Sequence, residues 1–434
     1  MLNLGGLELR EHTFQVPLDH AQPGLGTIEV FAREATLAGD DASARPWLVF
    51  LQGGPGFESP RPLGKDGWIG AAVEKYRVLL LDQRGTGRST PQTPEAILRE
   101  GDPKAQAAHL ARFRADSIVR DCEFIRDALG VRRWTLLGQS FGGFCVVHYL
   151  SFAPDSLAGA MITGGLPGLD AHADDVYRRT YPLTRAKNER MWSAFPGLRA
   201  RIQMVFQRVA EGDVLLPSGD ILTAERLQAV GAQLGFSRGA AELHYLFERA
   251  FAPGSDDLTR AFLRGVEGYF AFDTNPFYAI LHEACYGQGR ATDWSAQRIR
   301  GEFPEFDGAG ALSEDRTPLL TGEMVFPWFM DQFGALTPLR DAASELAGKD
   351  DWPSLYDSDV LSANQVPTAA VIYHDDMFVP ADLSLETAGR IRGLEAWVTN
   401  EFEHDGLRSA GGRIFSELTA RLHASAACLP GRAR

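Results

Sequence analysis

The sequence predicts an α/β protein: a mostly parallel sheet flanked by helices, with a large helical insertion. Three observations lead to this fold class. Residues 1–165 alternate short apolar runs with turns and helical patterns, which is typical of a parallel sheet covered on both faces. Residues 166–364 show helical periodicity and few strand-like runs. From residue 365 the strand pattern returns. We therefore expect two core segments, 1–165 and 365–434, around a mainly helical cap domain, 166–364.

The elements of this fold can be placed in chain order. Apolar side chains recur at helical spacing over residues 105–129 and stop at Gly130, which predicts a helix there. A final amphipathic helix is expected at 412–423. Long helical patterns in the insertion cover residues 177–209, 224–234 and 240–251. Apolar runs bounded by turn residues predict strands at 28–36, 47–51, 76–81, 134–137, 158–163, 368–373 and 395–399.

Composition and charge narrow the function classes. The chain has 434 residues, of which 44% are hydrophobic and 23% charged, as expected for a globular protein with a large core. Its formal net charge of -14 disfavours nucleic acid as a partner. The N-terminal residues lack the basic and apolar pattern of a secretory signal. No run reaches the roughly 18 apolar residues of a membrane span, so no membrane association is expected.

The cysteines suggest neither a metal centre nor a disulfide framework. Cys122, Cys145, Cys285 and Cys428 are widely and irregularly spaced, without a C-x-x-C pair. Such spacing is not that of a zinc site or of a small disulfide-rich domain. We therefore expect a protein of the reducing cytoplasm with no structural metal.

The sharpest local motif is the segment GQSFGG at residues 138–143, between an expected strand and a helix-like segment. This is the G-x-S-x-G pattern of a nucleophile elbow in its required strand–turn–helix context. The strained turn exposes the serine hydroxyl, and the helix N-terminus behind it directs N–H groups toward a developing oxyanion. The motif predicts an α/β-hydrolase fold with Ser140 as nucleophile. The alternative is a turn of small residues without a catalytic role.

A serine hydroxyl needs a base, and a histidine is expected after the last strand of this fold. His404 occupies that position, in the segment FEHDG at residues 402–406. The acid that orients the imidazole should follow the preceding strand, where Asp375 and Asp376 are adjacent. Asp376 is preferred because it lies four residues before Pro380, and Asp375 stays the alternative. A surface loop histidine is the competing interpretation of His404.

An oxyanion hole requires two N–H donors. One is expected from Phe141, directly after the nucleophile, and the other from the loop after the 47–51 strand, at Gly54 or Gly53. Glycine in that loop lets the backbone approach the substrate oxygen closely. A plain Gly-Pro turn is the alternative interpretation of this segment.

Taken together, these motifs resemble the proline iminopeptidase (prolyl aminopeptidase) family of α/β hydrolases. The resemblance rests on GGPG at residues 53–56, DQRGTGRS at 82–89 and GQSFGG at 138–143. The segments around residues 373–380 and 403–406 are similar to the longer branch of that family. Two departures are visible: Gln52 replaces the usual histidine before GGPG, and YHDD replaces the usual GRYD around the acid. The resemblance is weaker across the insertion.

The resemblance implies a serine aminopeptidase that acts on short peptides with a free N-terminal proline, without metal or organic cofactor. Carboxylates from the insertion should then bind the secondary ammonium group, and Glu267 and Glu283 are the candidates. Tyr269, Phe270 and Phe141 are candidates for an apolar slot around the pyrrolidine ring. The two glutamates fit solvated helix charges equally well. The aromatic residues fit a helical core.

Two other functions compete with the peptidase. The first is an esterase or amidase on the same scaffold, acting on other small substrates, because this fold hosts many activities. The second is a non-catalytic binding protein that keeps the fold. The expected partners are small peptides, without nucleic acid or membrane. The expected assembly is a monomer or a small homo-oligomer.

Overall fold

The computed structural model describes residues 2–429 and is built on one nine-stranded sheet. The strand order is β1-β2-β3-β5-β4-β6-β7-β8-β9. Neighbouring strands from β5 to β9 in this order are parallel, whereas β1, β2, β3 and β5 pair antiparallel in turn. The fold class expected from the sequence is therefore confirmed. The strands are β1 (Leu2–Leu4), β2 (Leu7–Pro17), β3 (Thr27–Leu37), β4 (Trp47–Leu51), β5 (Arg77–Leu81), β6 (Trp134–Gln139), β7 (Leu157–Thr163), β8 (Thr368–Tyr373) and β9 (Leu394–Thr399).

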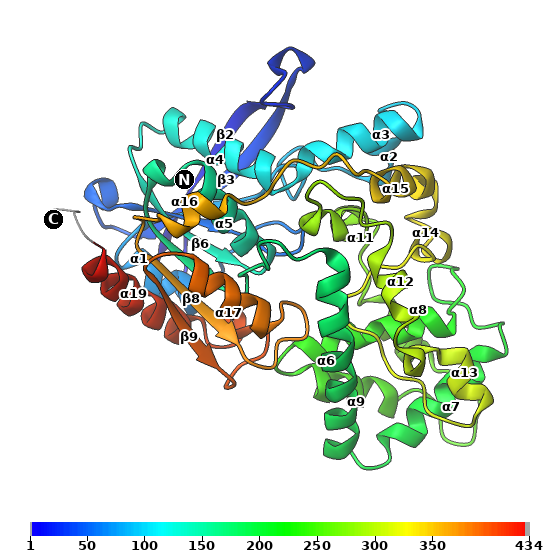
Figure 1. Ribbon diagram of the computed structural model, residues 1–434. Helices are drawn as coiled ribbons and strands as arrows, with labels where there is room; N and C mark the ends of the chain where they lie inside the picture. The colour runs from blue at the N-terminus through cyan, green and yellow to red at the C-terminus, as the bar shows by residue number, and fades with distance from the viewer. Residues whose placement is uncertain (1, 430–434) are drawn as a thin grey trace.

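Helices cover both faces of this sheet (Figure 1). α1 and α19 pack together on one face, and α4, α5, α16 and α17 lie on the other. The helices of the core are α1 (Gly67–Val73), α2 (Pro94–Leu98), α3 (Pro103–Leu110), α4 (Ala115–Ala128), α5 (Phe141–Phe152), α16 (Ser358–Ser362), α17 (Ala381–Arg390), α18 (Gly406–Ser409) and α19 (Gly411–Cys428).

The central parallel strands are buried on both faces, which is why they read as continuous apolar runs. All residues of β4 are buried, and their side chains alternate between two hydrophobic clusters. Val49 and Leu51 belong to the cluster that includes α4 and α5. Leu48 and Phe50 belong to the cluster that includes α1 and α19. A one-residue shift of this strand would exchange the two sets, so packing fixes its register.

Between β7 and β8 the chain forms a helical cap, drawn in green and yellow on the right of Figure 1. The first hydrophobic cluster continues from the sheet into this cap, so the two parts share one core. α16 precedes residue 364 but packs against α5 and α17. The boundaries at residues 165 and 364 stay predictions. The cap helices are α6 (Ala173–Ala194), α7 (Leu198–Ala210), α8 (Ala224–Gln228), α9 (Gly239–Glu248), α10 (Arg260–Glu267), α11 (Pro276–Leu281), α12 (Ser295–Arg300), α13 (Gly308–Ser313), α14 (Phe329–Gln332) and α15 (Arg340–Ala347).

The helix expected at residues 105–129 is two helices in the structure. α3 ends at Leu110 and α4 begins at Ala115, with Arg114 in an extended conformation between them. The buried guanidinium of Arg114 donates to the backbone oxygens of Ala284 and Gly287 in the cap. These partners lie far away in the sequence, so no local pattern could indicate the break.

Two further differences arise from local geometry. The pattern over residues 177–209 forms α6 and α7, separated by Gly197 at a φ of 84°, a conformation that glycine adopts readily. The pattern over residues 224–234 forms the short helix α8 and a 3-10 helix from Ala229 to Gly235. The N-terminal strands β1 and β2 were not expected from the sequence.

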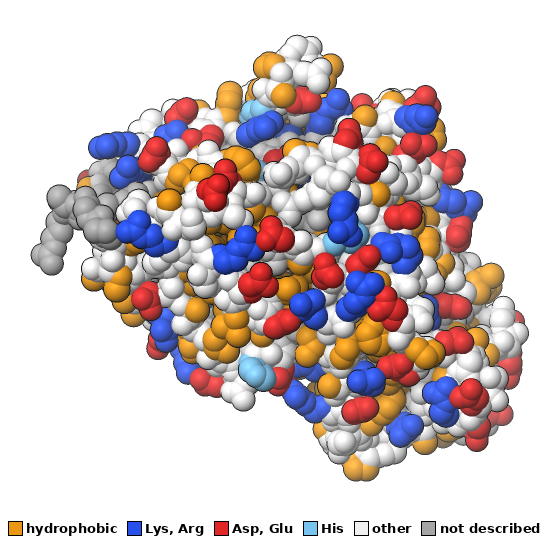
Figure 2. Space-filling view, viewed as in Figure 1, with side chains coloured by type: hydrophobic (Ala, Val, Ile, Leu, Met, Phe, Trp, Pro, Cys, Tyr) orange, Lys and Arg blue, Asp and Glu red, His pale blue; other side chains and the backbone are white. Residues whose placement is uncertain are grey.

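Charged side chains of both signs are interspersed over the face shown in Figure 2. The net negative charge is therefore not gathered into one acidic area on this face. Within residues 2–429, no helix combines the length and apolar character needed to cross a membrane.

Candidate active site

Ser140 lies at a sharp turn between β6 and α5. Its backbone has a φ of 53° and a ψ of -124°, a conformation that costs a residue with a side chain on the order of 1–3 kcal/mol. The turn passes so close to β4 that a Cβ on Gly142 would lie 2.0 Å from the Leu51 backbone oxygen. Only glycine fits at residue 142, which explains that part of the G-x-S-x-G pattern. At this turn Ser140 lines the wall of a cavity.

The Asp376 and His404 side chains meet at the ends of β8 and β9. His404 Nδ1 lies 2.7 Å from Asp376 Oδ2, and both side chains are buried. Asp376 Oδ1 accepts hydrogen bonds from the backbone N–H groups of Phe378 and Val379. Asp375 points elsewhere and is hydrogen-bonded to His374 and Arg190 at the surface. The geometry therefore favours Asp376 over Asp375 as the partner of the histidine.

Two opposing effects act on the pKa of His404. Burial disfavours the imidazolium and acts to lower the pKa, while the charge and hydrogen bond of Asp376 act to raise it. Burial is the largest single effect, but Asp376 together with the charges of Glu323 and Asp405 outweighs it, so the pKa lies above the usual value for histidine. Asp376 therefore stabilises the protonated imidazole, which a general base becomes after it accepts a proton.

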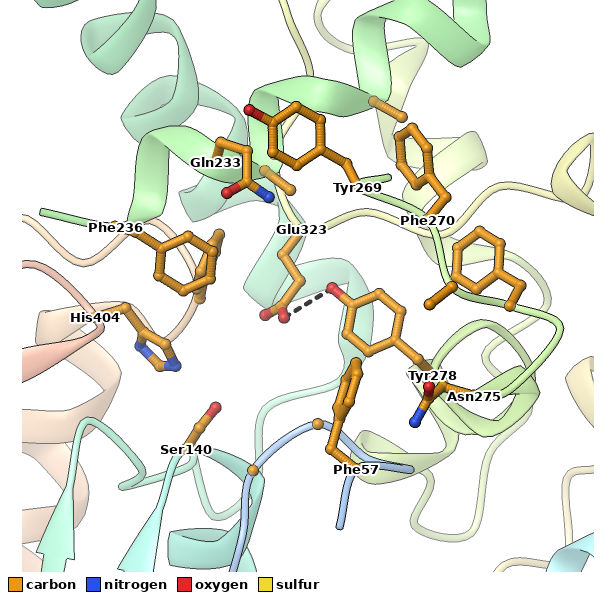
Figure 3. A pocket seen from close by; sticks show the side chains of 18 of the residues that line it. Phe57, Ser140, Gln233, Phe236, Tyr269, Phe270, Asn275, Tyr278, Glu323 and His404 are labelled. Carbon is orange, nitrogen blue, oxygen red and sulfur yellow. Dashed lines mark hydrogen bonds between the residues drawn. The ribbon is translucent and has the colours of Figure 1, made fainter. Parts of the chain in front are cut away.

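Ser140 and His404 line the same cavity, of about 500 Å³ (Figure 3). Their side chains are not hydrogen-bonded to each other among the contacts of residues 2–429. Such contacts are often loose in a free enzyme and tighten in the substrate complex. The three residues selected from the sequence are thus gathered at one end of the sheet, in the order and on the loops expected.

The two expected oxyanion elements also lie at this point. Phe141 is the first residue of α5, where N–H groups have no acceptor inside the helix. Gly53 and Gly54 line the cavity beside Ser140. A Cβ on Gly53 would come within 2.9 Å of the Ser140 Cβ, so only glycine lets the loop approach Ser140 this closely. Phe141, Gly53 and Gly54 all remain candidates for donors to an oxyanion.

The DQRGTGRS segment holds the glycine loop in place. The Gln83 side chain donates to the Gln52 backbone oxygen, directly before Gly53. Asp82 accepts from Arg61 and from the backbone N–H of Ser59, which lie further along the same loop. Arg84 is fully buried and forms a two-point ion pair with Asp121. Within this segment, Asp82 and Gln83 therefore brace the glycine loop, and Arg84 anchors the segment to α4.

The cap contributes the polar and aromatic wall of the cavity. Glu323 lies opposite Ser140 in Figure 3, half-buried, and accepts a hydrogen bond of 2.9 Å from the Tyr278 hydroxyl. No Lys, Arg or His among the described residues forms an ion pair with it. Glu58 also lines the cavity, but its carboxylate is paired with Arg61. Glu323 was not among the residues selected from the sequence.

Of the cap residues selected from the sequence, the aromatic pair lines the cavity and the acidic pair does not. Tyr269 and Phe270 belong to the cavity wall. Glu267 instead accepts from the backbone N–H of Ser218 and pairs with Arg264. Glu283 lies elsewhere in the cap interior. The expectation that Glu267 and Glu283 project into this pocket is therefore not met in the structure.

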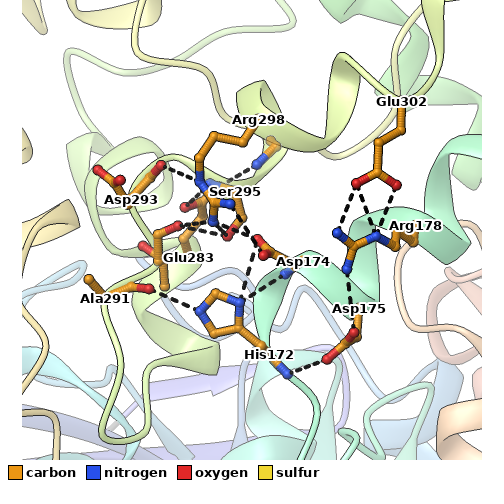
Figure 4. A network of polar contacts seen from close by, with 12 residues as sticks. His172, Asp174, Asp175, Arg178, Glu283, Ala291, Asp293, Ser295, Arg298 and Glu302 are labelled. Atoms are coloured by element: carbon orange, nitrogen blue, oxygen red, sulfur yellow. Dashed lines mark hydrogen bonds and ion pairs between the residues drawn. The ribbon is translucent and has the colours of Figure 1, made fainter.

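Glu283 belongs to a network of polar contacts inside the cap (Figure 4). Its two carboxylate oxygens accept hydrogen bonds from the backbone N–H groups of Ser295 and Ala296, at the start of α12. Burial raises the pKa of Glu283 to about 7, although these two hydrogen bonds act in the opposite direction. Its position at the helix N-terminus indicates a structural role.

Replacing Glu283 with Gln is expected to lower the free energy of unfolding by about 1–3 kcal/mol. The amide nitrogen of Gln would face one of the two N–H groups and leave it unpaired. Urea unfolding measures the loss, with Glu302→Gln as the control, because that change disturbs only an exposed ion pair with Arg178 in the same network. The structural role of Glu283 would be contradicted if Glu283→Gln kept the wild-type stability but no longer preferred substrates with a free amine.

The cap also contacts the loops that carry Asp376 and His404. Lys187 of α6 forms an ion pair with Glu403, and the His404 backbone N–H donates to the Gly235 oxygen. Asp405 accepts from the Ser237 backbone N–H and hydroxyl. These contacts fix the backbone on both sides of His404. Among residues 2–429, no group of three or more His, Cys, Asp or Glu side chains is arranged to hold a metal ion.

The parallel sheet, the strained serine turn and the buried Asp–His pair define the chain as an α/β hydrolase. Residues 46–211 match the family described as "alpha/beta hydrolase fold". A proline iminopeptidase from Aeromonas sobria is 47% identical over 419 residues, which cover 96% of each chain. The chain therefore belongs to the proline iminopeptidase family.

A second relative and one solved structure extend the comparison. Proline iminopeptidase aneH from Aspergillus aculeatus is 34% identical over 431 residues, covering 96% of this chain and 94% of the relative. A proline iminopeptidase-related protein from Thermus thermophilus has a solved structure that is 17% identical. Its TM-score is 0.40, and the match covers 96% of this chain and 99% of that one.

Proposed function

We propose that this protein is a serine aminopeptidase that releases N-terminal proline from short peptides. The observation that carries the proposal is the near full-length similarity to the proline iminopeptidase of Aeromonas sobria. It is supported by a cavity that combines a serine at a strained turn, a buried Asp–His pair and a cap carboxylate. These groups suit acyl transfer from a substrate that carries a positive charge beside the scissile bond.

In the proposed mechanism, Ser140 attacks the carbonyl carbon of the N-terminal residue while His404 takes the hydroxyl proton. The negative charge on the carbonyl oxygen is stabilised by N–H groups of Phe141 and the Gly53–Gly54 loop. His404 then donates its proton to the leaving amine, and the acyl-enzyme ester remains. Water, activated by His404, hydrolyses the ester and releases free proline. Asp376 holds the imidazole with Nδ1 protonated throughout.

Glu323 is proposed to bind the ammonium group of the substrate. Its carboxylate faces the same cavity as Ser140 and forms no ion pair with a cation among the described residues. The ammonium group of a substrate could therefore pair with it. A charge-assisted hydrogen bond in a partly dry cavity is strong and directional. The Tyr278 hydroxyl orients the carboxylate, and Tyr269 and Phe270 provide apolar surface further along the wall.

The direct test is a comparison of three substrates: prolyl p-nitroanilide, N-acetylprolyl p-nitroanilide and p-nitrophenyl acetate. The proposal expects rapid turnover of the first and little of the second. Turnover of the ester with no preference for free proline would support the esterase alternative and overturn the peptidase.

Replacing Glu323 with Gln is expected to lower kcat/KM for prolyl p-nitroanilide by about 100-fold, or nearly 3 kcal/mol. Gln keeps the shape and the contact with Tyr278 but removes the charge. The matched control is Glu58→Gln, which lies in the same cavity but is already paired with Arg61, and a change of less than about fivefold is expected there. Equal losses for the two variants would contradict a specific role for Glu323.

Two expectations about the environment of the protein also remain proposals. We infer a cytoplasmic location and a monomer or small homo-oligomer. Cys122, Cys145 and Cys285 are free and buried, which is compatible with a reducing compartment. Cell fractionation and light scattering of the purified protein test the two inferences separately.

A further inference from the structure

We propose that Arg408 binds the C-terminal carboxylate of the substrate, which makes short free peptides preferred over longer or C-terminally blocked ones. The inference rests on the proposed aminopeptidase function and specifies its substrate class. Arg408 is the one Lys or Arg among the described residues that line the cavity. It is exposed, and its guanidinium forms no ion pair with any described carboxylate.

The position of Arg408 is fixed by aromatic packing. Its guanidinium carbon lies 5.5 Å from the centre of the Phe236 ring, a cation–π arrangement. Phe236 packs edge-on against Phe378 at 5.5 Å, and Phe378 packs against His404 at 4.9 Å. The charged group is therefore held on the side of the cavity that carries His404.

The mechanism determines which part of the substrate reaches this side. His404 must deliver its proton to the leaving amine, so the residue after proline lies next to the imidazole. In a dipeptide, that residue carries its carboxylate one carbon away from the amine. Arg408 lies four residues after His404, and the rings of Phe236 and Phe378 pack between the two side chains. The Arg408 guanidinium is therefore placed to receive this carboxylate.

The charges of the cavity are complementary to a short zwitterionic peptide. Glu323 offers a negative charge for the N-terminal ammonium group, and Arg408 offers a positive charge for the C-terminal carboxylate. A guanidinium can bind a carboxylate through two parallel N–H donors, which adds direction to the attraction. In a longer peptide the terminal carboxylate would lie beyond this position, and the arginine would remain unpaired.

The experiment compares proline release from the dipeptide Pro-Ala and from its amide, Pro-Ala-NH₂, which share the same scissile bond. The wild type is expected to show a kcat/KM about tenfold higher for the free acid. In Arg408→Gln the ratio of the two values should fall to about one, mainly through KM. Arg408→Lys keeps the charge without the two-point geometry, and an intermediate ratio is expected.

The matched control is Arg238→Gln, which removes the same charge from an exposed arginine outside the cavity wall. Arg238→Gln is expected to keep the wild-type ratio of kcat/KM for Pro-Ala to that for Pro-Ala-NH₂. If this ratio fell in Arg238→Gln as well, the loss in Arg408→Gln would reflect only the removal of a positive charge, and the inference would be overturned. An equal kcat/KM for the two peptides in the wild type would also overturn the inference about Arg408, but it would not contradict the proposed aminopeptidase function. Failure to release proline from either peptide would reject both proposals.

Discussion

Replacing Ser140 with Ala is expected to lower kcat for prolyl peptides by about 10⁵- to 10⁶-fold, because the acyl-enzyme cannot form without its oxygen. Single-turnover release of proline measures the loss, and a fluorophosphonate probe should no longer label the protein. Ser151→Ala is the matched control: Ser151 lies on α5, the helix that follows Ser140, and its hydroxyl donates to the Val147 oxygen. More than about 1% residual activity in Ser140→Ala would reject the nucleophile assignment.

Loss of activity must be separated from loss of the fold. Ser140 has the backbone geometry that disfavours side chains, so Ser140→Gly relieves strain that Ser140→Ala retains. The glycine variant is expected to be equally inactive but to unfold at a urea concentration no lower than that of the wild type. An inactive variant of undiminished stability shows that the chemistry, and not the fold, has been removed.

The sequence predicted the core and the Ser140, Asp376 and His404 set because each depends on local order along the chain. A nucleophile elbow is a contiguous motif, and the acid and base follow particular strands of the sheet. The spacing to Pro380 favours Asp376 over Asp375 in the sequence, and the structure adds the physical reason, because adjacent residues after a strand point in different directions. Backbone N–H groups of Phe378 and Val379 turn Asp376 inward, while Asp375 remains near the surface.

The substrate side of the site could not be predicted in the same way. Glu323 lies in an irregular segment between α13 and α14, and it lines the same cavity as Ser140 only because the cap packs over the sheet. The buried Leu319–Leu320 pair before it is a faint signal that this segment enters the interior. The resemblance implies Glu267 and Glu283 instead, although Arg264, three residues before Glu267, already offers a surface ion pair at helical spacing.

Replacing Asp376 with Asn is expected to lower kcat by about 10⁴-fold. The amide oxygen of Asn would keep the hydrogen bonds from the Phe378 and Val379 N–H groups, which leaves its NH₂ facing His404 Nδ1. That donor favours the tautomer with the proton on Nε2, and such an imidazole cannot take a proton from Ser140. Asp375→Asn is the control, with less than about a threefold change expected, because it lies in a surface pair with Arg190.

The pH dependence gives an independent measure of the same contact. In the wild type Asp376 raises the pKa of His404, so kcat/KM should increase as the pH rises through a value above about 6.5, the usual pKa of histidine. Without the carboxylate, burial remains and acts to lower that pKa. The residual activity of Asp376→Asn should therefore begin to rise at a lower pH than in the wild type. An acidic limb at the same pH in both proteins would mean that the titrating group is not this histidine, and the pairing of Asp376 with the base would have to be abandoned.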